Sequence, residues 1–122
     1  MNCSCIYVEC DEFITLLSDQ IIKKAKKEHK CNECGEIISI GDGYRKECFI
    51  FEGFNIHKTC STCNSIREIF FCDNIIYSEM IYYLEQEIDE MKGDINQTCI
   101  AQLISSARNK VCDMIEEYWD EE

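Results

Sequence analysis

The sequence has no proline, five glycines and two histidines among its 122 residues. This scarcity of chain-breaking residues, together with 46% hydrophobic residues, excludes a disordered or low-complexity composition. Bases are also scarce, because 12 Lys and Arg stand against 24 Asp and Glu, which gives a net charge of −12. No apolar run reaches the roughly 18 residues that a membrane-spanning helix needs. We therefore expect one folded domain with no membrane segment.

Several catalytic patterns are missing as well. Neither His29 nor His57 is followed by the x-Glu of the zinc deaminases, and there is no Pro-Cys pair. The Gly41–Gly43 stretch lacks the further glycines and the lysine of a phosphate-binding loop. No cysteine is singled out as a nucleophile by its neighbours. We therefore expect a protein that is not an enzyme.

Cysteine, in contrast, is abundant, with 11 residues, and four of them form two Cys-x-x-Cys pairs. The first pair is Cys31 and Cys34, and the second is Cys60 and Cys63, with 25 residues between Cys34 and Cys60. Two such pairs present four thiolates to one tetrahedral Zn²⁺ ion. Gly35 directly follows the first pair, where the chain must turn and a residue without Cβ adopts positive φ without penalty. The spacing predicts a structural zinc site.

The second half of this ligand set has an alternative. His57 stands three residues before Cys60, so that Cys31, Cys34, His57 and Cys60 could bind the metal and leave Cys63 free. We favour the four cysteines, because the second pair opens a predicted helix whose N-terminal N–H groups stabilise thiolates. A site of four thiolates is also coordinatively closed, which is typical of structural zinc.

The remaining cysteines allow a second, less favoured metal site. Cys3 and Cys5 lie on one side of an extended segment, and a distant pair such as Cys72 and Cys99 would complete the set. The alternative is that these residues are small apolar side chains. The N-terminus does not resemble an apolar signal segment, so we expect a reducing cytoplasm in which the thiols are zinc-bound or buried.

The hydrophobic pattern predicts the order of elements. We expect a helix over 11–18, a strand over 20–30, a hairpin segment over 35–59 with turns at Gly41–Gly43 and Glu52–Gly53, and a helix over 61–71. A knuckle, a β-hairpin and a helix carrying the second cysteine pair follow the order of a treble-clef zinc finger. A zinc ribbon, which would place the second pair on another hairpin, fits less well. The predicted fold class is α+β, a treble-clef-like finger followed by a helical segment.

The C-terminal part predicts two amphipathic helices, over 75–92 and over 98–119, with Gly93 ending the first and a possible break at Ser105. The expected buried positions are Tyr77, Leu84, Ile88, Leu103, Val111 and Ile115. The expected exposed acids are Glu85, Glu87, Asp89, Glu90, Glu116 and Glu117.

The net charge differs between the first part of the chain and the predicted C-terminal helices. We treat 1–122 as a single domain made of an N-terminal segment (1–25), a zinc finger (26–72) and an acidic helical part (73–122). The last part holds 13 acids and three bases, or −10, whereas 1–72 holds 11 acids and nine bases, or −2.

Five motifs together resemble a family of small zinc-finger proteins encoded by bacteriophages and prophages, which is largely uncharacterised. They are the start Cys3-Ser-Cys5, the stretches 25–35, 41–44 and 58–63, and the end from Ala107 to Trp119. The resemblance covers most of the chain. It implies zinc on Cys31, Cys34, Cys60 and Cys63, and a place in the cytoplasm of a host cell.

We therefore expect a non-enzymatic protein that binds a host protein, with inhibition of a host nuclease or defence system as one outcome. An acidic helical surface suits the basic groove of such a target. The alternative is a nucleic-acid-binding regulator that uses the basic cluster from Lys23 to Lys30. The sequence does not predict an oligomeric state.

Overall fold

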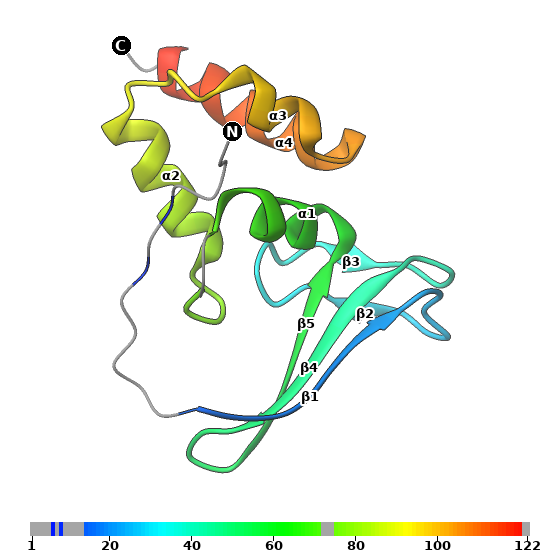
Figure 1. Cartoon of the computed structure of the whole chain (residues 1–122). Helices are drawn as coiled ribbons and strands as arrows, with labels where there is room; N and C mark the ends of the chain where they lie inside the picture. The colour runs from blue at the N-terminus through cyan, green and yellow to red at the C-terminus, as the bar shows by residue number, and fades with distance from the viewer. Residues whose placement is uncertain (1–5, 7, 9–13, 72–74, 121–122) are drawn as a thin grey trace.

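The computed structural model of the chain describes residues 6, 8, 14–71 and 75–120. These residues form five strands and four helices (Figure 1). In chain order the elements are β1 (Thr15–Ile22), β2 (His29–Lys30), β3 (Ile37–Ile38), β4 (Tyr44–Ile50), β5 (Phe54–Cys60), α1 (Ser61–Phe70), α2 (Met80–Glu90), α3 (Gln97–Gln102) and α4 (Ser105–Asp120). Antiparallel strands come first and helices follow, which confirms the predicted α+β class.

A three-stranded antiparallel sheet in the order β1-β4-β5 supports the rest of the fold. Strands β4 and β5 form a hairpin within the predicted range 35–59, in register from Tyr44 opposite Cys60 to Ile50 opposite Phe54. Strand β3, which we expected in the same hairpin, pairs instead with β2 in a separate two-stranded sheet. Glu52 and Gly53 both have positive φ, as the tight connection between the two strands requires. This register places the second cysteine pair at the end of the hairpin, where Cys60 is the last residue of β5.

The strands before the hairpin correct two predictions. The single strand expected over 20–30 is wrong, because β1 ends at Ile22 and β2 begins only at His29. We expected a helix over 11–18, yet Thr15–Ile22 is a strand that pairs with β4 from Thr15 opposite Ile50 to Ile22 opposite Tyr44. Leu16 and Leu17 are adjacent and both about half exposed, so local apolar periodicity does not distinguish helix from strand here. Pairing with the edge of the hairpin, a long-range interaction, decides in favour of the strand.

Helix α1 lies between the sheet and the layer that α3 and α4 form (Figure 1). It buries Cys63, Ile66 and Phe70 on one face, at steps of three and four residues. These side chains belong to one hydrophobic core that continues into the helical layer. The first turn of α1, which carries the second cysteine pair, is thereby held in place by the core of the whole domain.

The C-terminal helices follow the predicted pattern with shifted boundaries. Helix α2 begins at Met80 and not at residue 75, because Ser78 has a φ of 70° that a helix cannot contain. Gly93, with a φ of 76°, ends this region as predicted, and a break at Leu103 separates α3 from α4. Buried as predicted are Leu84, Ile88, Leu103, Val111 and Ile115, whereas Tyr77 is half buried.

Among the described helices, none has both the length and the apolar character that crossing a membrane requires.

Candidate metal centre

The first cysteine pair sits in a tight turn between β2 and β3. Cys31 N–H donates to Glu36 O at 2.9 Å, and Gly35 N–H donates to Cys31 O at 3.0 Å. Gly35 has a φ of 80°, in the left-handed region expected from its position after the pair. The turn therefore brings the sulfurs of Cys31 and Cys34 to the same side of the chain.

The second pair belongs to the start of α1. Cys60 is the last residue of β5 and the N-cap of the helix, and its Sγ accepts a hydrogen bond from Cys63 N–H at 3.4 Å. A sulfur in this position takes the place of the Ser, Thr or Asp oxygen that usually caps a helix. The predicted placement of this pair at a helix N-terminus is confirmed.

The four sulfurs of Cys31, Cys34, Cys60 and Cys63 all lie within 4.8 Å of one another. The sulfurs of Cys34 and Cys60 are 3.8 Å apart. Cys31 and Cys63 are buried, while Cys34 and Cys60 are half buried and line a shallow hollow beside α4. Such a cluster is a plausible metal site, and no other residue type joins it among the described residues.

Backbone N–H groups already point at this cluster. Cys31 Sγ accepts from Glu33 N–H at 3.4 Å and from Cys60 N–H at 3.3 Å. Hydrogen bonds of this kind stabilise the thiolate form of a sulfur. The metal-free fold therefore already provides backbone N–H donors to the sulfurs of a candidate metal site.

The four thiols do not ionise alike in the metal-free protein. Hydrogen bonds from the side chains of Cys60 and Cys63 hold the pKa of Cys31 far below its usual range. The Cys31 sulfur, as their acceptor, raises the pKa of Cys60 to about 12 and that of Cys63 further still, with burial adding to both shifts. Without a cation, Cys60 and Cys63 therefore keep their protons at neutral pH.

His57 does not belong to the cluster. Its Nε2 lies 2.6 Å from Glu33 Oε2, and its ring packs on that of Tyr77 with centroids 4.5 Å apart. The His57 and Glu33 side chains are 4% and 0% exposed. The His57 ring contacts Glu33 and Tyr77, and it is not part of the cluster of sulfurs. This agrees with the four-cysteine set that we favoured.

Both residues between Cys31 and Cys34 make structural contacts that the sequence did not predict. Asn32 exchanges hydrogen bonds with Lys58 on β5, at 2.8 Å and 2.7 Å. Glu33 accepts from Ser78 N–H at 2.8 Å and from Met80 N–H at 3.0 Å. Glu79, the N-cap of α2, provides no side-chain cap of its own. The turn that carries Cys31 and Cys34 therefore caps helix α2 through Glu33.

A second buried carboxylate joins the helices to the sheet. Glu47 on β4 is 1% exposed and contacts Arg67 of α1 at 2.5 Å and the Tyr77 hydroxyl at 2.7 Å. Burial, followed by the hydrogen bond to Glu47, raises the pKa of Tyr77. Arg45 adds a weaker contact to Glu47 at 3.7 Å. These groups satisfy one another and leave no group poised for chemistry, so we interpret them as structural.

The other cysteines do not assemble a second site among the described residues. Cys3, Cys5 and Cys72, which we considered for it, lie outside the described residues. Cys99 on α3 is buried and disulfide-bonded, so this cysteine departs from the expectation that the remaining thiols are simply buried.

The lysines from Lys23 to Lys30, the alternative binding site, are spread over the loop between β1 and β2 and over β2 itself. All five are exposed, and none makes a salt bridge within the described part of the chain.

Comparison of the chain with models of protein families, with curated proteins and with solved structures found no match.

Proposed function

We propose that the chain is a non-enzymatic zinc protein that presents an acidic helical surface to a host protein. The first part of this proposal rests on the sulfur geometry. Four Zn–S bonds of about 2.3 Å in a tetrahedron give S–S edges of roughly 3.8 Å. Cys34 and Cys60 stand at 3.8 Å, and the remaining pairs fall within 4.8 Å. Four sulfur donors favour Zn²⁺ over the harder Mg²⁺ or Ca²⁺.

The finger is best interpreted as treble-clef-like. A knuckle between β2 and β3, the hairpin of β4 and β5, and the helix α1 follow one another in that order. The second pair of ligands comes from the hairpin end and the first helical turn, which distinguishes this arrangement from a ribbon. A closed site of four sulfurs leaves no position for a substrate, which supports a structural role for the metal.

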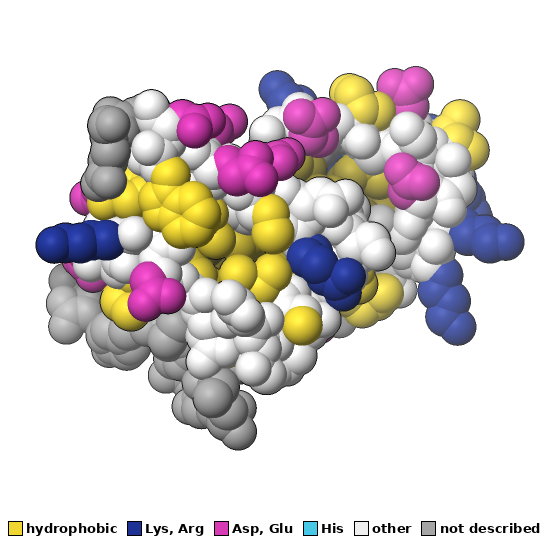
Figure 2. Space-filling model, turned by 90° about the horizontal axis from the view of Figure 1, so that it is seen from above, with side chains coloured by type: hydrophobic (Ala, Val, Ile, Leu, Met, Phe, Trp, Pro, Cys, Tyr) yellow, Lys and Arg dark blue, Asp and Glu magenta, His cyan; other side chains and the backbone are white. Residues whose placement is uncertain are grey.

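The observation that supports partner binding best is the surface of α2 and α4. The exposed acids there include Glu85, Asp89, Glu90, Asp113, Glu116 and Glu117. Figure 2, which looks down on the helical layer, shows Asp and Glu side chains gathered beside hydrophobic ones. A field of one sign attracts a basic partner and repels nucleic acid phosphates. For a protein of phage type, a basic host nuclease or defence protein is such a partner.

Salt dependence and charge removal test this proposal. We expect the zinc-loaded protein to retain a basic protein from host lysate at about 0.1 M salt and to release it near 1 M, where the Debye length falls from about 10 Å to about 3 Å. A variant with amides at Glu85, Glu87, Asp89 and Glu90 should associate more slowly with the purified partner. Equal association rates for this variant and the natural protein would contradict the proposal.

The runner-up function is nucleic-acid binding through Lys23–Lys30, favoured by the exposure of all five lysines in this range. A DNA and RNA gel shift at low salt, together with retention on heparin, would distinguish it from protein binding. We expect no shift for the natural protein. A shift that is lost when Lys24 and Lys27 become Gln would replace our proposal with the alternative.

A further inference from the structure

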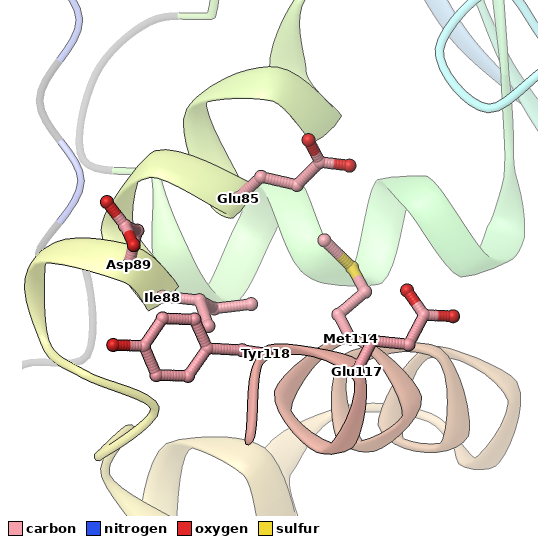
Figure 3. A pocket seen from close by; sticks show the side chains of 6 residues that line it. All are labelled: Glu85, Ile88, Asp89, Met114, Glu117 and Tyr118. Carbon is pink, nitrogen blue, oxygen red and sulfur yellow. The ribbon is translucent and has the colours of Figure 1, made fainter. Parts of the chain in front are cut away.

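A groove runs between α2 and α4 on the acidic side of the molecule. Two adjoining hollows form it, and they share Glu85, Met114 and Glu117. Figure 3 shows one of them, with Glu85 and Asp89 on α2 across from Met114, Glu117 and Tyr118 on α4. The described residues that line this groove come from these two helices alone.

The floor of the groove is apolar. Ile81, Ile88, Met114 and Tyr118 line it, and all except the buried Ile88 are half buried. A methionine in such a position adapts its shape to different side chains, which is common on surfaces that bind amphipathic helices. The floor therefore offers a place for apolar side chains of a partner.

The rims of the groove are acidic on both sides. Glu85 and Asp89 stand four residues apart on α2, and Asp113 and Glu117 stand four residues apart on α4. Like charges at this spacing oppose helix formation by about 0.2–0.5 kcal/mol per pair. Within the described residues no cation lies within salt-bridge distance of these four carboxylates, and Lys110 is the one base in the lining.

The rim carboxylates therefore slightly destabilise the two helices that carry them. The apolar floor distinguishes the groove from an ordinary solvated acidic face. Carboxylates four residues apart on a helix repeat about every 6 Å along its axis, because each residue rises about 1.5 Å. Lys or Arg residues four apart on a partner helix repeat at the same interval. A helix with an apolar stripe between two basic rows therefore complements the floor and both rims together.

We propose that the groove between α2 and α4 binds one cationic amphipathic helix of the partner protein, which lies as a further helix against α2 and α4. This inference deepens the proposed function and rests on it, since it assigns the general acidic attraction to one site and one kind of partner segment. Apolar residues of the partner helix contact Met114 and Ile88, and its lysines or arginines pair with Glu85, Asp89, Asp113 and Glu117.

The test uses a short synthetic helical peptide with a leucine stripe flanked by lysines, and a control peptide of the same composition in scrambled order. Both are titrated into the zinc-loaded, ¹⁵N-labelled full chain at low salt. We expect the striped peptide to shift the amides of α2 and α4 around the groove, and to bind about tenfold more tightly than the scrambled one.

Two matched variants separate local from general charge. One variant replaces the four rim acids by amides (Glu85→Gln, Asp89→Asn, Asp113→Asn, Glu117→Gln). It should bind the striped peptide about tenfold more weakly than the natural protein does. The control removes four exposed acids from the other half of the chain (Glu28→Gln, Glu36→Gln, Glu52→Gln, Glu68→Gln) and should change affinity by less than about threefold. The single variant Met114→Gln should lower the affinity for the striped peptide and leave the affinity for the scrambled peptide unchanged.

The outcomes distinguish this inference from the proposed function. Equal binding of both peptides, or equal loss in both fourfold variants, would overturn the groove and leave a general acidic surface. Shifts centred on the exposed sheet residues Ile50, Phe54 and Ile56 would also overturn it. Failure of the natural protein to bind either peptide at low salt would contradict both. If the fourfold rim variant does not fold, Met114→Gln serves as the test. If Met114→Gln binds the striped peptide as tightly as the natural protein does, the proposed binding groove is wrong.

Discussion

Glu33 and His57 form a buried pair, with 2.6 Å between the carboxylate oxygen Oε2 and Nε2 of the imidazole. The same carboxylate accepts hydrogen bonds from Ser78 and Met80 at the start of α2. Glu33 lies between the proposed metal ligands Cys31 and Cys34, so one side chain joins this turn, the hairpin and the acidic part. The proposed zinc is therefore coupled to the position of the acidic helix.

The first prediction concerns this coupling. Glu33→Ala should reduce the free energy of unfolding by about 3 kcal/mol, because it leaves two helix N–H groups without partners and removes the carboxylate that contacts a buried imidazole. Denaturant unfolding at saturating zinc measures the loss. Hydrogen exchange should show that Met80–Tyr83 lose protection first. The control Glu28→Ala removes an exposed acid and should change stability by less than about 0.5 kcal/mol. Equal stability of the two variants would show that Glu33 does not stabilise the start of α2.

A second prediction follows from the thiol protons. Cys60 and Cys63 have raised pKa values in the metal-free protein, and both must lose a proton to bind metal. Zinc binding should therefore release at least these protons, and affinity should rise with pH around neutrality, where the raised pKa of Cys60 keeps its thiol protonated. Calorimetry in buffers of different ionisation enthalpy measures the release. A binding heat independent of the buffer at neutral pH would contradict it.

The third prediction uses the single tryptophan. Gly93 has a φ of 76°, and a Cβ there would lie within 2.3 Å of Trp119 Nε1. Gly93→Ala should displace the indole, break its hydrogen bond to Lys92 O and shift its fluorescence to the red. The backbone strain should cost about 1–2 kcal/mol of stability. Gly53→Ala is the control, because its φ is also positive but nothing lies within 4 Å of the added Cβ. An unchanged emission in Gly93→Ala would mean that Trp119 does not pack there.

The sequence predicted those features that depend on local spacing. The cysteine pairs, the positive φ at Gly35 and the hairpin that ends at Cys60 are all local, and α1 was foreseen because its apolar residues recur at helical intervals. The helix expected over 11–18 was wrong where the structure describes it. There, pairing with β4 outweighs an ambiguous local pattern.

The contacts of Glu33 and Glu47 could not be predicted in the same way. Glu33 meets Met80 across 47 residues, and Glu47 meets Tyr77 across 30, so no periodicity links the partners. The one available signal was an acidic residue inside a Cys-x-x-Cys knuckle, which is equally consistent with a solvated side chain. Likewise Asp113 was not among the acids we expected at the surface, although it completes one rim of the groove.

A fourth prediction covers the knuckle turn. Gly35→Ala should lower the stability of the zinc-loaded protein by about 1 kcal/mol, because a Cβ at a φ of 80° is strained although the nearest atom, Lys30 Cε, is 3.7 Å away. Denaturant unfolding at saturating zinc measures the change. Asn at this position tolerates positive φ, so Gly35→Asn should lose less. An equal loss in both variants would point to crowding and not to backbone strain.

Metal content, measured by native mass spectrometry and elemental analysis, tests the central claim most directly. We predict one zinc ion per chain in the natural protein and in His57→Gln, which keeps an N–H donor toward Glu33. Cys34→Ser and Cys63→Ala should lose the metal and melt at a far lower temperature, since structural zinc contributes on the order of 10 kcal/mol to folding in small fingers. A natural protein without zinc, or zinc retained in Cys63→Ala but lost in His57→Gln, would contradict the account.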